Sequence, residues 1–205
     1  TTGTTVLQGI RDAVGSSRTV TYSKDGSGFD SSYSAAVAVI GETPYAEGEG
    51  DRTSSMGLDS TDLATLSRLQ GKGVPVIVVL VSGRPLDIAQ QLPDWNALVA
   101  AWLPGTEGAG VADVLFGDHA PSGKLPVTWM RSASQQPIND GDGQSPLFPY
   151  GYGLTYASPT TTTTTTTTKP TTTTNTCQPS SPWVSSATTS SITWTIPSSP
   201  CRSVG

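Results

Sequence analysis

The segment Pro75–Val81 constrains the fold more than any other part of this chain of 205 residues. Its sequence, PVIVVLV, is almost entirely apolar and β-branched, which is typical of a strand buried on both faces. Ala35–Ile40, with the sequence AAVAVI, predicts a second buried strand bounded by turn residues. Because such strands occur in parallel sheets that helices cover, we expect an α/β domain.

The first 155 or so residues alternate between helical and extended patterns. Apolar residues from Val6 to Val14 share one face of a short helix that ends near Gly15. The other predicted helices run through Leu63 to Leu69, after a cap at Asp59 or Ser60, and through Val111 to Leu115. Further short strands are predicted at Thr19–Tyr22 and Ala97–Trp102. The fold we predict is a mostly parallel sheet of about five or six strands with helices on both faces.

The composition changes sharply at Thr160. Residues 158–176 are almost entirely Thr, Pro and Ser, so we expect a disordered linker with plausible O-glycosylation sites. Residues 177–205 follow, with Trp183, Ile192, Trp194 and Ile196 in strand-like spacing. About 29 residues are too few for a complete β-sandwich module. We therefore predict three parts: an α/β domain over 1–157, the linker over 158–176, and a partial β module over 177–205.

The chain has two cysteines, Cys177 and Cys201, both near the end of the sequence. A disulfide that closes this loop would stabilise it by about 3 kcal/mol and would require an oxidising compartment. Two free thiols are the alternative. No His or third Cys accompanies the pair, which argues against a zinc site.

Charge and hydropathy exclude several classes of function. The formal net charge is −5 and no basic cluster occurs, which argues against binding to nucleic acid or to anionic membranes. The longest apolar run, Val74–Val81, is far shorter than the roughly 18 residues of a membrane span. The chain starts at Thr1 without an initiator Met or a signal peptide, so we expect a piece of a longer protein. Abundant Thr, Ser and Gly with few charges favour a secreted protein.

An acidic, glycine-rich segment, GETPYAEGEGDR over residues 41–52, follows the strand predicted at Ala35–Ile40. Its glycine content predicts a loop. Open α/β sheets bind their ligands beyond the carboxyl ends of their strands, where this loop would lie. A solvated acidic loop without a specific role is the alternative.

Seven sequence segments, in order, resemble the carboxyl-terminal α/β domain of family 3 glycoside hydrolases, especially its exo-β-glucanase and β-glucosidase branch. Each motif alone is weak, but their order along about 150 residues is specific. The segments are residues 3–10 (GTTVLQGI), 41–51 (GETPYAEGEGD), 82–85 (SGRP), 100–108 (AAWLPGTEG), 114–118 (VLFGD), and finally 122–129 (SGKLPVTW) together with 148–154 (FPYGYGL).

The resemblance implies a role for this acidic loop. Retaining glycosidases use two carboxyl groups, a nucleophile and an acid/base. In the family, the nucleophile is an Asp in a preceding (β/α)₈ barrel and the acid/base is a Glu on this loop. Carried over by motif, the general acid/base falls on Glu47, with Glu42 at the strand end as second choice. Glu49 lies outside the pattern and is expected to be solvated, and Asp51 and Arg52 suit an ion pair that anchors the loop.

The resemblance also implies what the chain lacks. No Asp in residues 1–157 occupies a position resembling the nucleophile motif, and we expect the barrel to be missing from this chain. We therefore predict a secreted β-glucosidase fragment that needs no cofactor or metal and is inactive or nearly so alone. Its partners would be β-linked glucosides or oligosaccharides and the upstream barrel of the same enzyme.

Other sequence features have structural interpretations. Gly105–Gly110 lacks the ending and glycine spacing of a phosphate loop, so we expect tight packing at a helix start. Arg84 suits a structural ion pair or an interdomain contact, with sugar contact as the alternative. Trp102 and Trp129 are expected in the core or at a domain interface, although stacking on sugars is the alternative. His119 is expected to be exposed.

Two other classes of function stay open. A non-catalytic carbohydrate-binding or scaffold domain would bind glucose or cellobiose without turnover. An unrelated flavodoxin-like domain would need a phosphate loop after its first strand or an acidic metal pocket over several strand ends, and neither pattern occurs.

Overall fold

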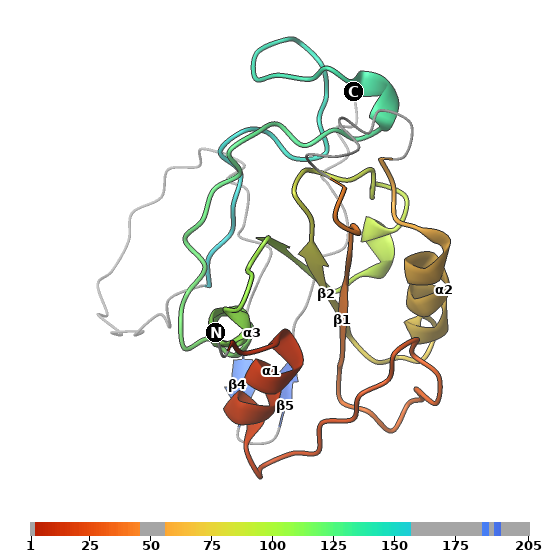
Figure 1. Cartoon of the computed structure of the whole chain (residues 1–205), viewed down its shortest axis with the longest axis vertical. Coiled ribbons are helices and arrows are strands. Elements are labelled where there is room, and N and C mark those ends of the chain that lie inside the picture. Colours follow the sequence, from red (N-terminus) through yellow and green to blue (C-terminus); the bar gives the residue numbers. More distant parts are fainter. Residues whose placement is uncertain (1–2, 46–55, 157–185, 189–190, 194–205) are drawn as a thin grey trace, which may run out of the picture. The chain divides into compact units, whose positions relative to one another are not determined.

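The computed structural model describes residues 3–45, 56–156, 186–188 and 191–193. Residues 1–155 and 156–205 form two compact units, which are treated separately below. The elements of the first unit, labelled in part in Figure 1, are α1 (Val6–Val14), β1 (Ala36–Gly41), α2 (Ser60–Leu69), β2 (Val76–Val81), the 3₁₀ helix Leu92–Asp94, β3 (Ala97–Trp102), α3 (Gly108–Phe116) and the 3₁₀ helix Ala133–Gln135.

The three strands form one parallel sheet in the order β1-β2-β3. The predicted strands Ala35–Ile40, Pro75–Val81 and Ala97–Trp102 are therefore confirmed within a residue at each end. All residues from Val76 to Leu80 are buried, as expected for a strand covered on both faces. β1 buries only Ala36, Ala38 and Ile40, while its alternate valines are exposed.

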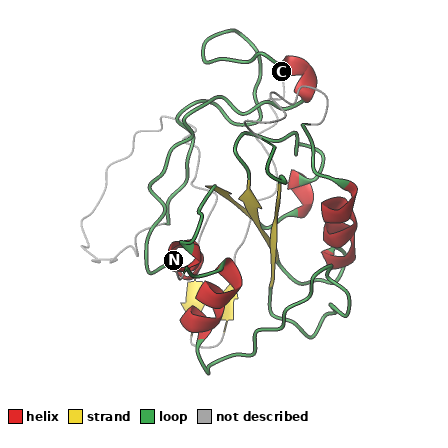
Figure 2. Ribbon diagram, in the orientation of Figure 1, coloured by secondary structure: helices red, strands yellow, loops and turns green. Residues whose placement is uncertain are grey.

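The sheet is smaller than predicted, because the described residues contribute three strands rather than about five or six. The prediction of a strand at Thr19–Tyr22 was wrong, since this segment is irregular and Tyr22 is 62% exposed. Local β-branching favours an extended backbone, but a strand also needs a neighbouring edge and a buried face. Between α3 and Tyr156 the described residues are mostly loop (Figure 2), with a single isolated β-bridge, between Trp129 and Phe148. Prolines in this region remove the donors that a longer ladder would need.

Helices lie on opposite sides of the sheet in the view of Figure 1, with α2 on one side and α1 and α3 on the other. α2 begins at the N-cap Asp59, whose carboxylate accepts from the N–H groups of Thr61 and Asp62, each at 2.8 Å. Its buried residues Leu66 and Leu69 join the core formed by the inward face of β1 and by β2. The predicted cap and extent of this helix are confirmed.

α1 and α3 pack closely because glycines meet where they cross. A Cβ on Gly9 would lie 2.6 Å from the carbonyl oxygen of Gly108, and a Cβ on Gly108 would lie 2.2 Å from the carbonyl carbon of Thr5. α1 ends at Gly15, which adopts a positive φ of 57°, as predicted. The expected tight packing at the helix start after Gly105 is therefore confirmed.

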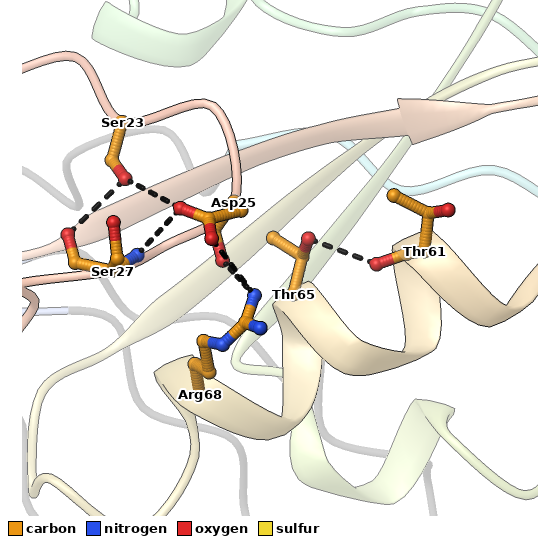
Figure 3. Close-up of polar contacts among 6 residues, drawn as sticks. All are labelled: Ser23, Asp25, Ser27, Thr61, Thr65 and Arg68. Atoms are coloured by element: carbon orange, nitrogen blue, oxygen red, sulfur yellow. Dashed lines mark hydrogen bonds and ion pairs between the residues drawn. The ribbon is translucent and has the colours of Figure 1, made fainter.

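The irregular segment between α1 and β1 is tied to α2 by Asp25 and Arg68 (Figure 3). The Arg68 guanidinium lies 3.3 Å from the Asp25 carboxylate and donates a hydrogen bond to the Asp25 carbonyl at 2.8 Å. Asp25 also accepts hydrogen bonds from Ser27 N–H and from the Ser23 hydroxyl. Hydrogen bonding from Ser27, followed by the charge of Arg68, lowers the pKa of Asp25. About half of each side chain is exposed, so this pair orders a surface turn rather than part of the core.

In the second unit, the described residues form a short antiparallel pair, β4 (Ser186–Thr188) and β5 (Ser191–Thr193). Both strands lie in the part of the chain that was predicted to be β-like. The Thr-rich linker and the proposed Cys177–Cys201 disulfide fall outside the described residues, so those predictions stand as they were.

Candidate functional site

The carboxyl ends of the three strands meet at one edge of the sheet. Gly41 at the end of β1 is paired in register with Val81 of β2, and Val81 is paired with Trp102 of β3. The acidic segment that starts at Gly41 therefore begins at this edge, as predicted. In open α/β sheets this is the edge where ligands bind, so it is the candidate functional site.

Glu42 is the first residue of the acidic segment after β1, and it is firmly held. Its N–H donates to the Val81 carbonyl at 3.0 Å, which extends the ladder by one bond. Its side chain is 7% exposed, and Oε1 accepts from Arg84 Nε at 2.9 Å. Oε2 is buried and has no hydrogen-bond partner among the described residues. Glu42 is therefore buried and ion-paired, and it holds the start of the acidic segment at the end of β1.

Arg84 comes from the loop after β2 and is 15% exposed. Besides the ion pair with Glu42, its guanidinium carbon lies 4.8 Å from the centre of the Tyr45 ring, within the range of a cation–π contact. The predicted structural ion pair of Arg84 is thus confirmed, with Glu42 as its partner. Sequence reasoning did not identify this partner, although both residues directly follow predicted strands.

The turn that carries Arg84 is fixed by buried polar contacts. Ser82, 2% exposed, donates through its hydroxyl to the Arg84 carbonyl at 2.8 Å. The N–H of Ser82 donates to the Trp102 carbonyl at 3.1 Å. These bonds connect the end of β2 to the end of β3, so the Arg84 backbone has little freedom to move relative to the sheet.

The end of β1 is also held from the side of α2. The Gly41 N–H donates to Asp62 Oδ2 at 3.0 Å. A Cβ on Gly41 would lie only 1.8 Å from the Val81 carbonyl oxygen, so the approach of the two strands requires glycine here. Burial raises the pKa of Asp62; the hydrogen bond from Gly41 opposes this and the charge of Asp59 adds to it.

Aromatic side chains adjoin the same edge in a continuous row. Trp102 packs against Trp129 at 5.9 Å between centroids, Trp129 meets Phe148 edge-on at 6.0 Å, and Phe148 stacks on Tyr152 at 5.0 Å. Trp129 is 1% exposed and donates through Nε1 to the Leu86 carbonyl at 2.8 Å. The prediction of core packing is confirmed for Trp129, and partly buried Trp102 packs against the same core.

Trp102 adopts a positive φ of 54°, the only non-glycine residue to do so in the described part of the chain. This left-handed conformation is unfavourable for a bulky side chain and costs on the order of 1 kcal/mol or more. It turns the chain at the end of β3 so that the indole faces Trp129. No feature of the local sequence signalled this conformation.

Several predicted site residues lie outside the described residues. They include Glu47, the predicted general acid/base, and also Glu49, Asp51 and Arg52. The structure therefore brings Glu42, Arg84 and Tyr45 together at the stem of the acidic segment and does not test the role of Glu47. His119 is exposed, as expected.

No metal centre is found in the portion of the chain with described structure, where no group of three or more His, Cys, Asp and Glu side chains could hold an ion. The same portion contains no helix with the length and apolar character needed to cross a bilayer. The described residues form a site at the carboxyl ends of the strands. It contains the buried Glu42–Arg84 ion pair and the neighbouring ring of Tyr45.

Comparison with known proteins shows which family the sequence matches. Residues 1–156 match the sequence model of the glycosyl hydrolase family 3 C-terminal domain. A periplasmic β-glucosidase of Salmonella typhimurium is 33% identical over 145 residues, which are 60% of this chain and 19% of that protein. A β-xylosidase of Formosa agariphila is 32% identical over 182 residues, which are 75% of this chain and 25% of that protein.

Solved structures agree with these relatives. A β-glucosidase from Listeria innocua in complex with isofagomine has a TM-score of 0.60 at 26% identity, covering 75% of this chain and 26% of that chain. A β-glucosidase from Kluyveromyces marxianus in complex with glucose has a TM-score of 0.56 at 30% identity, covering 62% of this chain and 18% of that chain. The chain thus spans between a fifth and a quarter of the length of the relatives in sequence.

Proposed function

The chain belongs to glycosyl hydrolase family 3 through its C-terminal domain, and from this we propose that it bears the acid/base of a retaining β-glucosidase. The enzyme would hydrolyse terminal β-D-glucosyl residues from β-linked glucosides or oligosaccharides. The observation that carries the proposal is the family match over residues 1–156, which includes the whole acidic segment after β1. Relatives named β-glucosidase and β-xylosidase are both hydrolases of β-linked sugars, and the GETPYAEGEGD sequence favours glucose.

We assign the general acid/base to Glu47. In a retaining mechanism this group gives its proton to the leaving oxygen and then takes a proton from the attacking water. The nucleophilic carboxylate must lie about 5–5.5 Å away, on the other side of the scissile bond. Glu47 suits the role because it follows Tyr45 by two positions on a segment that starts at the ligand-binding edge of the sheet.

Glu42 is the weaker candidate for this role. One carboxylate oxygen is engaged by Arg84 and the side chain is 7% exposed. A general acid must reach the glycosidic oxygen of a bound sugar within hydrogen-bond distance. The buried ion pair leaves Glu42 little access to substrate, which supports an anchoring role instead.

We propose that the nucleophile comes from a (β/α)₈ barrel domain of the same enzyme. No Asp of residues 1–157 lies in a segment that resembles the family's nucleophile motif. Acid/base assistance contributes about 10²–10⁴-fold and acts on a substrate that other groups have positioned. The chain alone is therefore expected to be inactive or nearly so.

The first experiment measures hydrolysis of an aryl β-glucoside by the purified chain and by the chain fused behind the barrel of a β-glucosidase relative. The chain alone is expected to give background rates, and the fusion is expected to give turnover. In the fusion, Glu47→Gln should lower kcat about 10²–10⁴-fold. Glu49→Gln is the matched control and should leave kcat unchanged, because Glu49 lies outside the family pattern.

Four results would contradict this assignment. Turnover by the chain alone that Glu47→Gln abolishes would mean that a nucleophile lies within these residues. Full activity of the Glu47→Gln fusion would remove Glu47 from the mechanism, and a large loss in Glu42→Gln alone would transfer the role to Glu42. If the fusion to the relative's barrel bound glucose or cellobiose but did not hydrolyse cellobiose, a non-catalytic carbohydrate-binding domain would be favoured.

We also propose that the protein is secreted. Its Thr-rich linker and its two cysteines, Cys177 and Cys201, support an extracellular location, where the pair would form a disulfide. Alkylation of the protein isolated from its native host, with and without prior reduction, tests this. Labelling of both cysteines without reductant would contradict the proposal.

A further inference from the structure

Arg84 contacts both ends of a five-residue stem, Gly41–Tyr45, that leads into the segment with Glu47. Its Nε donates to Glu42 Oε1 at 2.9 Å, and its guanidinium lies 4.8 Å from the centre of the Tyr45 ring. Glu42 and Tyr45 are three positions apart, so one planar group restrains both the start and the end of the stem. Arg84 itself belongs to a different loop, after β2.

The stem is restrained on its other sides by the sheet and by α2. The N–H of Glu42 donates to the Val81 carbonyl, and the N–H of Gly41 donates to Asp62. The backbone of Arg84 is itself fixed through the buried hydroxyl of Ser82. Arg84 therefore connects the end of β2 to Tyr45. Tyr45 is the described residue nearest to Glu47 in the sequence.

We propose that Arg84 is a positioning residue for the reaction, an inference that rests on the proposed function of Glu47. Two residues of chain span at most about 7 Å, so the position of Tyr45 limits the region that Glu47 can reach. A shift of about 1 Å at a reacting group can cost 10²-fold in rate. Arg84 sets where the acidic segment leaves the sheet, and through this stem it would limit where the proposed proton donor can lie.

The buried ion pair also explains why arginine suits this position. The guanidinium is flat, so it can donate in its plane to Glu42 while its carbon lies over the Tyr45 ring. A lysine would keep the positive charge next to the buried Glu42 carboxylate but would lose the flat face. Arg84→Lys therefore separates the positioning of Tyr45 from the neutralisation of Glu42.

The test compares two substrates in the barrel fusion. A 2,4-dinitrophenyl β-glucoside has a leaving group that departs without a proton, whereas cellobiose requires general acid assistance. Both substrates form the same glycosyl-enzyme, whose hydrolysis needs the same residue as base, so kcat/KM rather than kcat reports the first step. Loss of acid catalysis lowers kcat/KM for cellobiose far more than for the dinitrophenyl substrate. A general loss of folding or sugar binding lowers both values alike, which makes the ratio of the two kcat/KM values the informative readout.

We expect Glu47→Gln, Arg84→Lys and Arg84→Gln all to lose more on cellobiose than on the dinitrophenyl glucoside. For the Arg84 variants the selective loss should be about 10–10²-fold in kcat/KM. Arg84→Lys in the Glu47→Gln background should cause no further loss on cellobiose, since it acts through the same group. Arg68→Gln is the matched control, because it removes an ion-paired arginine from α2 and should leave the ratio unchanged.

Arg84→Lys carries the test if Arg84→Gln fails to fold. Equal losses on both substrates, an unchanged kcat/KM for cellobiose in Arg84→Lys, or losses that add to those of Glu47→Gln would each overturn the positioning role while leaving Glu47 as the acid/base. Unchanged rates in Glu47→Gln would overturn the proposed function, and the role of Arg84 would fall with it.

Hydrogen exchange on the full chain gives a readout that is independent of activity. In the Arg84 variants, amides of the stem Gly41–Tyr45 should exchange faster than in the wild type, with Glu42 as the reporter because its N–H is bonded to Val81. Arg68→Gln should leave these amides unchanged. Unaltered exchange in Arg84→Lys and Arg84→Gln would contradict the restraint of the stem by Arg84.

Discussion

The carboxylate of Glu42 and the guanidinium of Arg84 form an ion pair with 2.9 Å between Oε1 and Nε, and the two side chains are only 7% and 15% exposed. They come from the ends of two neighbouring parallel strands, β1 and β2. Removal of one partner from a buried pair leaves an uncompensated charge, which is strongly destabilising. The pair therefore couples the stability of the domain to the geometry of the candidate site.

Arg84→Gln is expected to lower the free energy of unfolding by about 3–5 kcal/mol, because the Glu42 carboxylate then lies buried without its counter-charge. The double variant Glu42→Gln/Arg84→Gln should recover most of this loss, since no charge is left unpaired. Urea denaturation of the four proteins of the cycle measures the coupling. Additive losses in the double variant would show that the two side chains contribute independently.

Gly108→Ala is expected to destabilise the contact between α1 and α3 severely, because its Cβ would lie 2.2 Å from the carbonyl carbon of Thr5. Gly110→Ala is the matched control on the same helix, where a Cβ meets nothing within 4 Å. That control should raise stability by about 0.4–1 kcal/mol, since alanine favours the helix. Thermal unfolding compares the melting temperatures of the two variants. Similar melting temperatures for Gly108→Ala and Gly110→Ala would contradict the close crossing of α1 and α3.

Asp62→Asn is expected to change the pH dependence of stability. Burial raises the pKa of Asp62 above its usual value of 3.8, so the native state binds this proton more tightly than the unfolded state. The stabilisation from this proton is fully present below about pH 3.8, and it is lost as the pH rises through the raised pKa of Asp62. Asparagine can still accept the Gly41 N–H but cannot ionise.

The free energy of unfolding of Asp62→Asn, relative to the wild type, should therefore increase as the pH rises above about 3.8 and level off once the pH exceeds the raised pKa of Asp62. Urea denaturation over this range measures the difference. Asp12→Asn, on an exposed position of α1, serves as a control for the loss of one carboxylate. A relative stability that falls with rising pH would mean that the folded protein favours the Asp62 carboxylate.

Trp129→Phe is expected to cost about 1–3 kcal/mol in the free energy of unfolding beyond any change in packing. The indole Nε1 donates to the buried carbonyl of Leu86 at 2.8 Å, and phenylalanine would leave that oxygen without its donor. Denaturant unfolding measures the loss. Trp102→Phe should cost less, because Trp102 is only partly buried; a larger loss in Trp102→Phe would reverse this ranking.

Much of the first unit follows from local sequence patterns. The apolar β-branched run that ends at Val81 predicts its strand, and Asp59 and Gly15 mark helix ends that the structure confirms. The ordered motifs indicate the family, and residues 1–156 match its C-terminal domain. These features depend on neighbours within a few positions along the chain, so they are visible in the sequence.

Other features failed to follow from local patterns. Thr19–Tyr22 has the residues of a strand but no neighbouring edge to pair with in the described structure. The expected sheet of five or six strands becomes three in the described residues, because the region around the Trp129–Phe148 bridge contains prolines that interrupt a ladder. The β-propensity of a segment depends on its own residues, whereas a sheet also requires a second strand to pair with it.

The sequence by itself determined where the three paired strands and the three α-helices of the first unit lie, where the acidic segment begins, and the family of the domain. The tertiary structure alone decided that Arg84 pairs with Glu42 and faces Tyr45, that Gly9 meets Gly108, and that Trp102 turns toward Trp129. The physical reason is distance along the chain. Local propensities act over a few residues, whereas these contacts depend on strand register and helix crossing, which only the packed chain sets.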